Sequence, residues 1–266
     1  MLPSCKPHKT RNILLQAELI KTIAMERPLR GPIYVTRPSM PPLERYQALL
    51  EEIWDTAWLT NAGRFHRELE VRIADYLGVE YLSLFSSGTT ALLIALRGLG
   101  IDSGEVITTP FTFPATTHVL RWNDLRPVFC DIDPKTLNLD PNKIEALITE
   151  ETRAILPVHV YGTPCDTGAI EAIGKRHGLP VIYDAAHTFG ARYHGKALAD
   201  FGDCAMISFH ATKQFSTAEG GALVMRSAEE KARVEFLQNF GIADEETVVG
   251  PGINGKLSEL HAALGL

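Results

Sequence analysis

Apolar residues recur at two spacings along the chain from Pro32 onward. Residues 43–54 and 65–77 place an apolar side chain every three or four positions, which is the period of a helix with one buried face. Beyond them, short apolar runs bounded by glycine, proline and polar residues predict strands. The expected strands are 81–85, 105–109, 127–130, 154–160, 180–183, 205–209 and 221–225.

Helical patterns lie between these runs, at 91–99, 141–148 and 167–177. Asp140 and Asp166 stand where N-caps are expected, and Gly178 stands where the third of these helices should end. The alternation predicts an α/β fold with a largely parallel sheet. Residues 254–266 begin one more helical pattern that the end of the chain interrupts, so we expect a C-terminal part to be missing.

Composition supports an ordinary globular protein. The chain has 266 residues, of which 45% are hydrophobic and 22% charged, enough for a large buried core. No apolar run approaches the roughly 20 residues of a membrane helix. The 4 cysteines lack metal-like spacing, which predicts no metal site and a reducing, cytoplasmic location. A net charge of −6 argues against a general nucleic-acid-binding surface.

The first 31 residues differ from the rest, because basic residues outnumber acidic ones there. Part of this segment is amphipathic, as in a transit peptide, but it lacks the long apolar stretch of a secretory signal. We expect a disordered extension at 1–31, or a true start of translation at Met25.

A phosphate site is one interpretation of Ser87-Gly88-Thr89-Thr90, which lies between an expected strand and a helix. The first N–H groups of a helix have no partner within it and attract anions. Gly88 allows a close approach of the backbone, and the two threonine hydroxyls add donors. A plain turn before a capped helix explains the same residues.

An acid and an amine follow two other expected strands. Asp184 ends one apolar run and is followed by His187, and Lys213 comes shortly after another run. A carboxylate in a cleft can pair with a cation, and a buried lysine loses its charge and becomes nucleophilic. The plainer alternatives are a capping aspartate and a solvated surface lysine.

Two aromatic residues, Phe111 and Phe113, stand between a strand and a helix, where one can stack on a flat ring or pack in the core. A phosphate seat, a flat-ring partner, a carboxylate and a lysine together indicate pyridoxal phosphate. The aldehyde of this cofactor condenses with a lysine amine, and an acid keeps its ring nitrogen protonated so that the ring accepts electrons.

With these residues in view, the sequence resembles the DegT/DnrJ-type sugar aminotransferases, which are fold-type I (aspartate aminotransferase-like) enzymes dependent on pyridoxal phosphate. The resemblance covers 32–266 and implies a mixed, mostly parallel sheet with flanking helices. It further implies a cofactor-binding large domain at 32–240 and the start of a truncated small C-terminal domain at 241–266. The matching stretches are Trp58-Leu59-Thr60-Asn61, Ser87-Gly88-Thr89-Thr90-Ala91-Leu92, Thr109-Pro110-Phe111-Thr112-Phe113, Asp184-Ala185-Ala186-His187, Ser208-Phe209-His210-Ala211-Thr212-Lys213 and Glu219-Gly220-Gly221.

The resemblance implies a role for each matching residue. Lys213 would hold the cofactor covalently and later move a proton between the substrate carbon and the cofactor. Asp184 would pair with the pyridine nitrogen, His187 would face the ring hydroxyl, and Phe113 would stack on the ring. The phosphate would be held by Gly88, Thr89, Thr90 and Ser208.

The resemblance also implies a homodimer with a shared active site. Asn254 aligns with an asparagine that reaches the phosphate of the neighbouring subunit. Gly255 and Lys256 follow it, where the family usually has an aromatic and then a basic residue. The lysine at position 213 argues against the branch of the family that carries histidine there and catalyses dehydration.

The implied activity is that of a cytoplasmic aminotransferase. It would convert a nucleotide-linked keto-sugar to an amino-sugar, with an amino acid, expected to be glutamate, as donor. The product would enter polysaccharide, glycolipid or antibiotic sugar synthesis, and neither nucleic acid nor membrane is an expected partner. Two alternatives stay open: another fold-type I pyridoxal-phosphate enzyme, and a catalytically inactive homologue that is truncated or regulatory.

Overall fold

The computed structural model describes residues 31–34, 36–244 and 247–266. Pro38–Leu266 forms one compact unit, while Met1–Arg37 is assigned to another, whose described residues are all exposed. The prediction for 1–31 therefore lies outside the described residues, apart from Gly31. The domain boundary expected after residue 240 stays a prediction. Across the described ranges, no helix has the length and apolarity that crossing a bilayer requires.

Strands and helices alternate along the compact unit. The strands are β1 (Tyr81–Phe85), β2 (Glu105–Thr108), β3 (Arg126–Phe129), β4 (Thr152–Leu156), β5 (Ile182–Asp184), β6 (Arg192–Tyr193), β7 (Lys196–Ala197), β8 (Cys204–Ser208) and β9 (Gly221–Met225). The α-helices are α2 (Leu43–Thr56), α3 (Arg64–Leu77), α4 (Gly88–Gly98), α5 (Pro114–Trp122), α6 (Thr167–His177), α7 (Ala228–Gln238) and α8 (Glu259–Gly265). Short 3-10 turns are η1 (Pro141–Lys143), η2 (Glu145–Leu147), η3 (Val160–Gly162) and η4 (Leu198–Asp200).

The central sheet is mixed and mostly parallel. One part has the strand order β1-β9-β8-β5 and the other has the order β3-β2-β4. Bridges between Ile155 and Val181 and between Val158 and Asp184 join the two parts in parallel. Strand β9 is antiparallel to β1 and β8, whereas β5 pairs with β8 in parallel, as β2 does with β3 and β4. The predicted fold class is thus confirmed.

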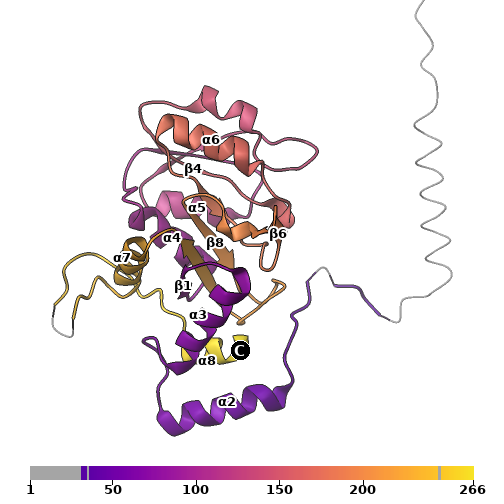
Figure 1. Cartoon of the computed structure of the whole chain (residues 1–266), viewed down its shortest axis with the longest axis vertical. Helices are drawn as coiled ribbons and strands as arrows, with labels where there is room; N and C mark the ends of the chain where they lie inside the picture. The colour runs from indigo at the N-terminus through magenta and orange to yellow at the C-terminus, as the bar shows by residue number, and fades with distance from the viewer. Residues whose placement is uncertain (1–30, 35, 245–246) are drawn as a thin grey trace, which may run out of the picture. The chain divides into compact units, whose positions relative to one another are not determined.

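Helices cover both faces of the sheet (Figure 1). Successive side chains of a strand point to opposite faces, so each central strand packs against helices on both. On one face, α4, α5 and α7 bury apolar side chains against residues such as Met206 and Leu223. On the other face, α3, α6 and α8 pack with residues such as Ile207 and Val224. Strands β8 and β9 are apolar on both faces for this reason, as buried central strands are.

The predicted helix at 141–148 is wrong in type, because the structure has the turns η1 and η2 there. Asp140 still caps the segment, and its carboxylate accepts the Asn142 N–H at 3.0 Å. Nucleation of an α-helix is unfavourable, and a segment this short adds few hydrogen bonds to offset it. Tighter turns with i→i+3 bonds close it instead, for example from the Ile144 N–H to the Pro141 carbonyl at 3.3 Å.

The predicted helix at 254–266 begins only at Glu259, as α8, with Ser258 as its N-cap. Before it, the Gly255 carbonyl accepts the Ser86 N–H at 2.7 Å, so the chain lies extended beside the end of β1. Helical periodicity alone does not reveal such a long-range pairing. Helix α8 then packs on α2 and α3, as Figure 1 shows.

Two boundaries shift at the ends of strands that matter for the site. Helix α4 begins at Gly88 rather than at residue 91, and its N-cap Ser87 accepts the Thr90 N–H on Oγ at 3.0 Å. Strand β4 ends before Pro157, which has no N–H for the ladder. Gly88, Thr89 and Thr90 of the expected phosphate seat therefore form the first helical turn after the Ser87 cap. The chain after Leu156 still follows β5, because Val158 forms a parallel bridge with Asp184.

Candidate active site

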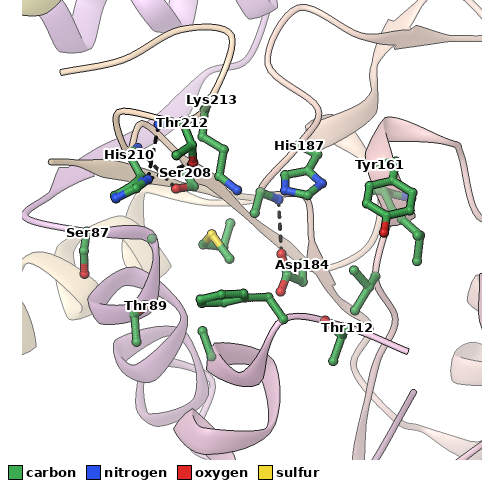
Figure 2. Close-up of a pocket in the computed structure, with 18 of the residues that line it drawn as sticks. Ser87, Thr89, Thr112, Tyr161, Asp184, His187, Ser208, His210, Thr212 and Lys213 are labelled. Carbon is green, nitrogen blue, oxygen red and sulfur yellow. Dashed lines mark hydrogen bonds between the residues drawn. The ribbon is translucent and has the colours of Figure 1, made fainter. Parts of the chain in front are cut away.

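A cavity of about 630 Å³ opens at the carboxyl ends of the parallel strands. Open α/β sheets usually bind ligands at this edge. Its walls come from the start of α4, the loop before α5, the turn after β4 and the chain beyond β5 and β8 (Figure 2). The structure brings together here the predicted site residues Gly88, Thr89, Phe113, Asp184, His187, Ser208 and Lys213.

The start of α4 supplies one wall and is pressed closely against the sheet. A Cβ atom added to Gly88 would lie 2.8 Å from the Met206 sulfur, and one added to Gly221 would lie 2.5 Å from the Gly88 nitrogen. Glycine is thus required at position 221, where a side chain would meet the backbone of α4, and a side chain at position 88 would displace that of Met206. Ser208, at the end of β8, is only 8% exposed and lines the same wall. Unpaired helix N–H groups and hydroxyls are the donors that a phosphate needs.

Asp184 ends β5 and is buried, with 5% of its surface exposed. Its Oδ2 accepts the Thr116 hydroxyl at 2.7 Å, and its Oδ1 accepts the Ala186 N–H at 3.1 Å. Burial raises the pKa of this carboxyl, whereas the two hydrogen bonds and the nearby His187 and Lys213 oppose that rise. An ionised carboxylate has about four lone-pair sites, so capacity remains for a cationic N–H donor in the cavity.

Lys213 lies in the loop between β8 and β9, and its amine points into the cavity (Figure 2). The loop is held by its own backbone, since the Lys213 N–H donates to the His210 carbonyl and the Ala211 N–H to the Ala218 carbonyl, both at 2.8 Å. Burial lowers the pKa of the lysine, and the Asp184 carboxylate opposes this. A larger fraction of the amine is therefore neutral than on an exposed lysine, as a nucleophile or base requires.

His187 stands beside the carboxylate and the amine at the edge of the cavity (Figure 2). Desolvation and the Lys213 charge lower its pKa, and Asp184 raises it. Its ring lies parallel to that of Tyr161, with 6.1 Å between the ring centres. Tyr161 has a left-handed backbone with φ of 53° and is 73% exposed. Non-glycine residues with such backbones cluster at functional sites.

These residues fit pyridoxal phosphate. The helix start and Ser208 suit its phosphate, the buried Asp184 carboxylate suits a protonated ring nitrogen, and Lys213 suits its aldehyde. Phe113 lines the cavity with 75% of its surface exposed, so its ring is available to a flat partner. The assignment of each residue to a part of the cofactor stays a prediction.

Two predicted site residues lie outside this cavity. The Thr90 hydroxyl is 2.8 Å from Ser87 Oγ, so it forms a hydrogen bond within the first turn of α4. Asn254 is exposed and forms a bridge with Asn239 in the segment before α8. The predicted role of Asn254 concerns a neighbouring subunit and stays a prediction.

Several lining residues were not among the predicted ones. They are Tyr161, the threonines at 112 and 212, and the pair His210 and Glu219, whose Nε2 and Oε1 atoms are 3.6 Å apart. Phe111, the other candidate for stacking on a flat ring, lines the cavity as well. Thr116, which binds Asp184, was missed as well. Thr112, His210, Thr212 and Glu219 stand in stretches that carry the resemblance to the family, and this signal points to them. Tyr161 and Thr116 stand outside those stretches. Their contacts depend on segments distant in sequence.

A scan of protein families matches residues 43–266 to the DegT/DnrJ/EryC1/StrS aminotransferase family. Over 238 residues the chain is 54% identical to a protein of Shigella dysenteriae named dTDP-4-amino-4,6-dideoxy-D-glucose transaminase. This match covers 90% of the chain and 65% of that protein. The chain thus spans slightly less than two thirds of the relative's length.

Two solved structures of other proteins have the same fold. DesI, described in the presence of its TDP-sugar product, superposes with a TM-score of 0.84 at 39% identity, over 89% of this chain and 60% of DesI. NtdA of Bacillus subtilis, described with bound cofactor PMP, superposes with a TM-score of 0.78 at 30% identity, over 89% of this chain and 56% of NtdA.

Proposed function

The chain belongs to the DegT/DnrJ/EryC1/StrS aminotransferase family, and from this premise we propose that it transfers an amino group to a nucleotide-linked keto-sugar. Pyridoxal phosphate is the cofactor and an amino acid, glutamate, is the donor. The observation that carries the proposal is the meeting of a half-buried lysine amine and a buried carboxylate, Lys213 and Asp184, in one cavity beside a helix start. The names of the Shigella relative and of the DesI structure support a dTDP-linked sugar as substrate.

The cofactor, when bound, supplies an aldehyde carbon that takes up the amino group and a ring that accepts electron density. The start of α4 and Ser208 would hold its phosphate, and Phe113 would lie against its ring. Asp184 would keep a proton on the ring nitrogen, because a nearby negative charge favours the charged form of a base.

Lys213 would act twice in this scheme. Its amine would anchor the cofactor until the amine of the donor takes its place. The released, neutral Nζ would then take a proton from the reacting substrate carbon and deliver it to the cofactor. Partial burial lowers the lysine pKa, which brings it toward the operating pH, where a general base works best. The cavity beside it is large enough, at about 630 Å³, for a flat cofactor with a sugar next to it.

We also propose that the enzyme is a cytoplasmic homodimer. Asn254 is exposed and lies outside the cavity of its own chain, as a contact with the phosphate site of a second copy requires. Gel filtration with and without pyridoxal phosphate, compared for the wild type and Asn254→Ala, tests the contact. A purely monomeric protein that binds the cofactor fully would contradict it.

The function is tested first by the absorbance of the purified chain with pyridoxal phosphate, followed by borohydride reduction and peptide mapping. A yellow protein whose phosphopyridoxyl group maps to Lys213 is expected. Amination of the dTDP-linked 4-keto-sugar with glutamate should follow, and Lys213→Ala should lower its rate by about 10⁴-fold, the upper end for proton transfer.

Lys143→Ala is the matched control, since Lys143 pairs with Asp131 at 3.0 Å on the surface and lies outside the cavity. It should keep full activity. A label on Lys213 without any turnover would favour the inactive, regulatory homologue over the enzyme. Full turnover by Lys213→Ala would overturn the assignment of the lysine.

A further inference from the structure

Two threonine hydroxyls connect the cavity carboxylate to helix α5. The Thr116 side chain is fully buried, and its Oγ1 lies 2.7 Å from Asp184 Oδ2. The Thr112 Oγ1 lies 2.7 Å from the Thr116 Oγ1, and Thr112 also lines the cavity. Three side chains thus form one hydrogen-bonded row from the buried carboxylate to the cavity wall.

The row has a single direction when Asp184 is ionised. A hydroxyl carries one hydrogen, and an ionised carboxylate only accepts. The Thr116 hydrogen is therefore used on Asp184, and the short contact between the two hydroxyls requires Thr112 to donate to Thr116. The Thr116 hydroxyl then accepts one bond and donates another, which leaves it little freedom to rotate.

The hold on the carboxylate comes from two independent elements. Ala186 donates to Oδ1 from the chain just after β5, and Thr116 donates to Oδ2 from α5. The terminal torsion of an aspartate has a broad minimum, so the side chain alone does not define the plane of the carboxylate. With one donor on each oxygen, the plane is defined by the protein.

We propose that Thr116 is a positioning residue for Asp184: its hydroxyl, oriented by Thr112, holds the carboxylate ionised and turned into the cavity. The row needs no substrate and is complete in the protein alone. Only the identity of the cationic group that Asp184 meets rests on the proposed function.

Other titratable groups lie near the same carboxylate, and their effects on its pKa must be distinguished from that of Thr116. His187 in the chain after β5 and Lys213 in the loop after β8 both favour the ionised form. His159, in the turn after β4, also lines the cavity, but burial lowers its pKa to about 3, so its ring stays neutral. Variants of Thr116 leave these three groups in place.

The test is a titration of Asp184 in the full 266-residue chain without cofactor, followed by the Cγ signal of ¹³C-labelled aspartate and assigned with Asp184→Asn. Thr116→Val keeps the shape of the side chain and removes the hydroxyl. The midpoint should rise by about one to two pH units, as loss of a hydrogen bond to a charged group implies. Thr112→Val should raise it less, because its hydroxyl is one step removed.

Two further variants keep a structural effect apart from a positioning effect. Thr116→Ser restores the hydroxyl and should restore the wild-type midpoint. Thr117→Val on the same helix removes a hydroxyl that donates to the Pro114 carbonyl at 3.1 Å, and it should leave the midpoint unchanged. An unchanged midpoint in Thr116→Val, or an equal rise in Thr117→Val, would overturn the proposal.

A second readout is the affinity for pyridoxal phosphate as a function of pH, measured by quenching of protein fluorescence. Protonation of Asp184 removes its charge, so the pH below which affinity declines should move upward in Thr116→Val by the same amount as the midpoint. A shifted midpoint with an unshifted affinity profile would overturn the link to the ligand. If the wild type binds no pyridoxal phosphate, the proposed function fails, whereas the titration still decides the role of Thr116.

Discussion

Two buried carboxylates in this protein have nearly the same exposure and opposite surroundings. Asp184 is 5% exposed and Glu259 is 2% exposed, and each accepts two hydrogen bonds. Asp184 borders a cavity that is also lined by a lysine and a histidine. Glu259 is the first residue of α8, and its side chain reaches the start of α3 and does not line the cavity. The two carboxylates are therefore similarly buried. They differ in their surroundings, which are a cavity for Asp184 and a helix start for Glu259.

Glu259 completes a helix. Its Oε2 accepts the Phe65 N–H at 2.8 Å and its Oε1 accepts the His66 N–H at 3.0 Å. A negative charge at a helix N-terminus is favoured by the helix dipole. Gly63 permits the approach, since a Cβ there would lie 2.4 Å from the Glu259 carboxyl carbon. Both oxygens are bound by fixed backbone donors, so this acid stabilises α3.

Asp184 has one donor on each oxygen as well, and it differs from Glu259 in the kind of donor and in what lies beside it. One of its donors is a side-chain hydroxyl, and part of its surroundings is open cavity rather than protein. Burial raises the pKa of Asp184, whereas a ligand cation in the cavity would lower it. The comparison teaches that a buried acid with spare acceptor capacity toward a cavity is a candidate for function, and one closed by backbone donors is a candidate for stability.

The largest expected effect that separates the two acids is on catalysis. Asp184→Asn should lower the amination rate by about 10² to 10³-fold, the range for loss of a preorganised electrostatic group. The rate is measured at saturating cofactor. Glu259→Gln should leave the rate per folded molecule near that of the wild type. Equal losses in both variants would remove the distinction.

The same Asp184→Asn variant should be no less stable than the wild type at neutral pH without cofactor. The folded-state pKa of Asp184 is raised, so ionisation costs stability as the pH rises from the ordinary aspartate value through the folded one. Asparagine avoids that cost, and its amide can donate to the Thr116 oxygen. Thermal unfolding at acidic and neutral pH measures the difference in stability between the variant and the wild type. The advantage of the variant should vanish at acidic pH.

The next effect concerns stability. Glu259→Gln places an amide NH₂ against a backbone N–H of the α3 start, so one buried donor loses its acceptor. The free energy of unfolding should fall by about 1 to 3 kcal/mol, the cost of an unsatisfied buried group. Urea unfolding measures the change. A variant as stable as the wild type would show that the α3 start does not depend on this carboxylate.

The smallest expected effect concerns two helix caps, one at the cavity and one away from it. Ser87 caps α4 at the cavity and Ser227 caps α7 away from it, and their Oγ atoms accept the Thr90 N–H at 3.0 Å and the Glu230 N–H at 3.1 Å. Replacement by alanine should cost each about 1 kcal/mol of stability. Only Ser87→Ala should also weaken the binding of pyridoxal phosphate. Equal affinities in both variants would place the phosphate elsewhere.

Local sequence signals worked where a segment carries its own start and stop. Helix α6 begins and ends as predicted, because Asp166 accepts the Ala169 N–H at 3.0 Å and Gly178 adopts the left-handed conformation at the end. They failed where a neighbour decides the backbone. The extended stretch before α8 is one example, since its partner, the end of β1, lies far away in the chain.

The candidate site divides in the same way. Gly88, Asp184 and Lys213 were found from the sequence because each follows an apolar strand, and the parallel arrangement brings strand ends to one edge. Thr116 and Tyr161 were missed. The Thr116 hydroxyl meets a carboxylate 68 positions away, and nothing in the local pattern of either residue indicates that contact.

The sequence by itself determined the fold class, the family and the set of residue types that suits pyridoxal phosphate. These depend on periodicity, caps and short motifs, which act between neighbouring residues. Only the tertiary structure decided which hydroxyls meet Asp184, which buried acid faces the cavity, and that Thr90 serves its own helix. Such choices depend on contacts between distant segments, whose distances are set when the helices pack on the sheet.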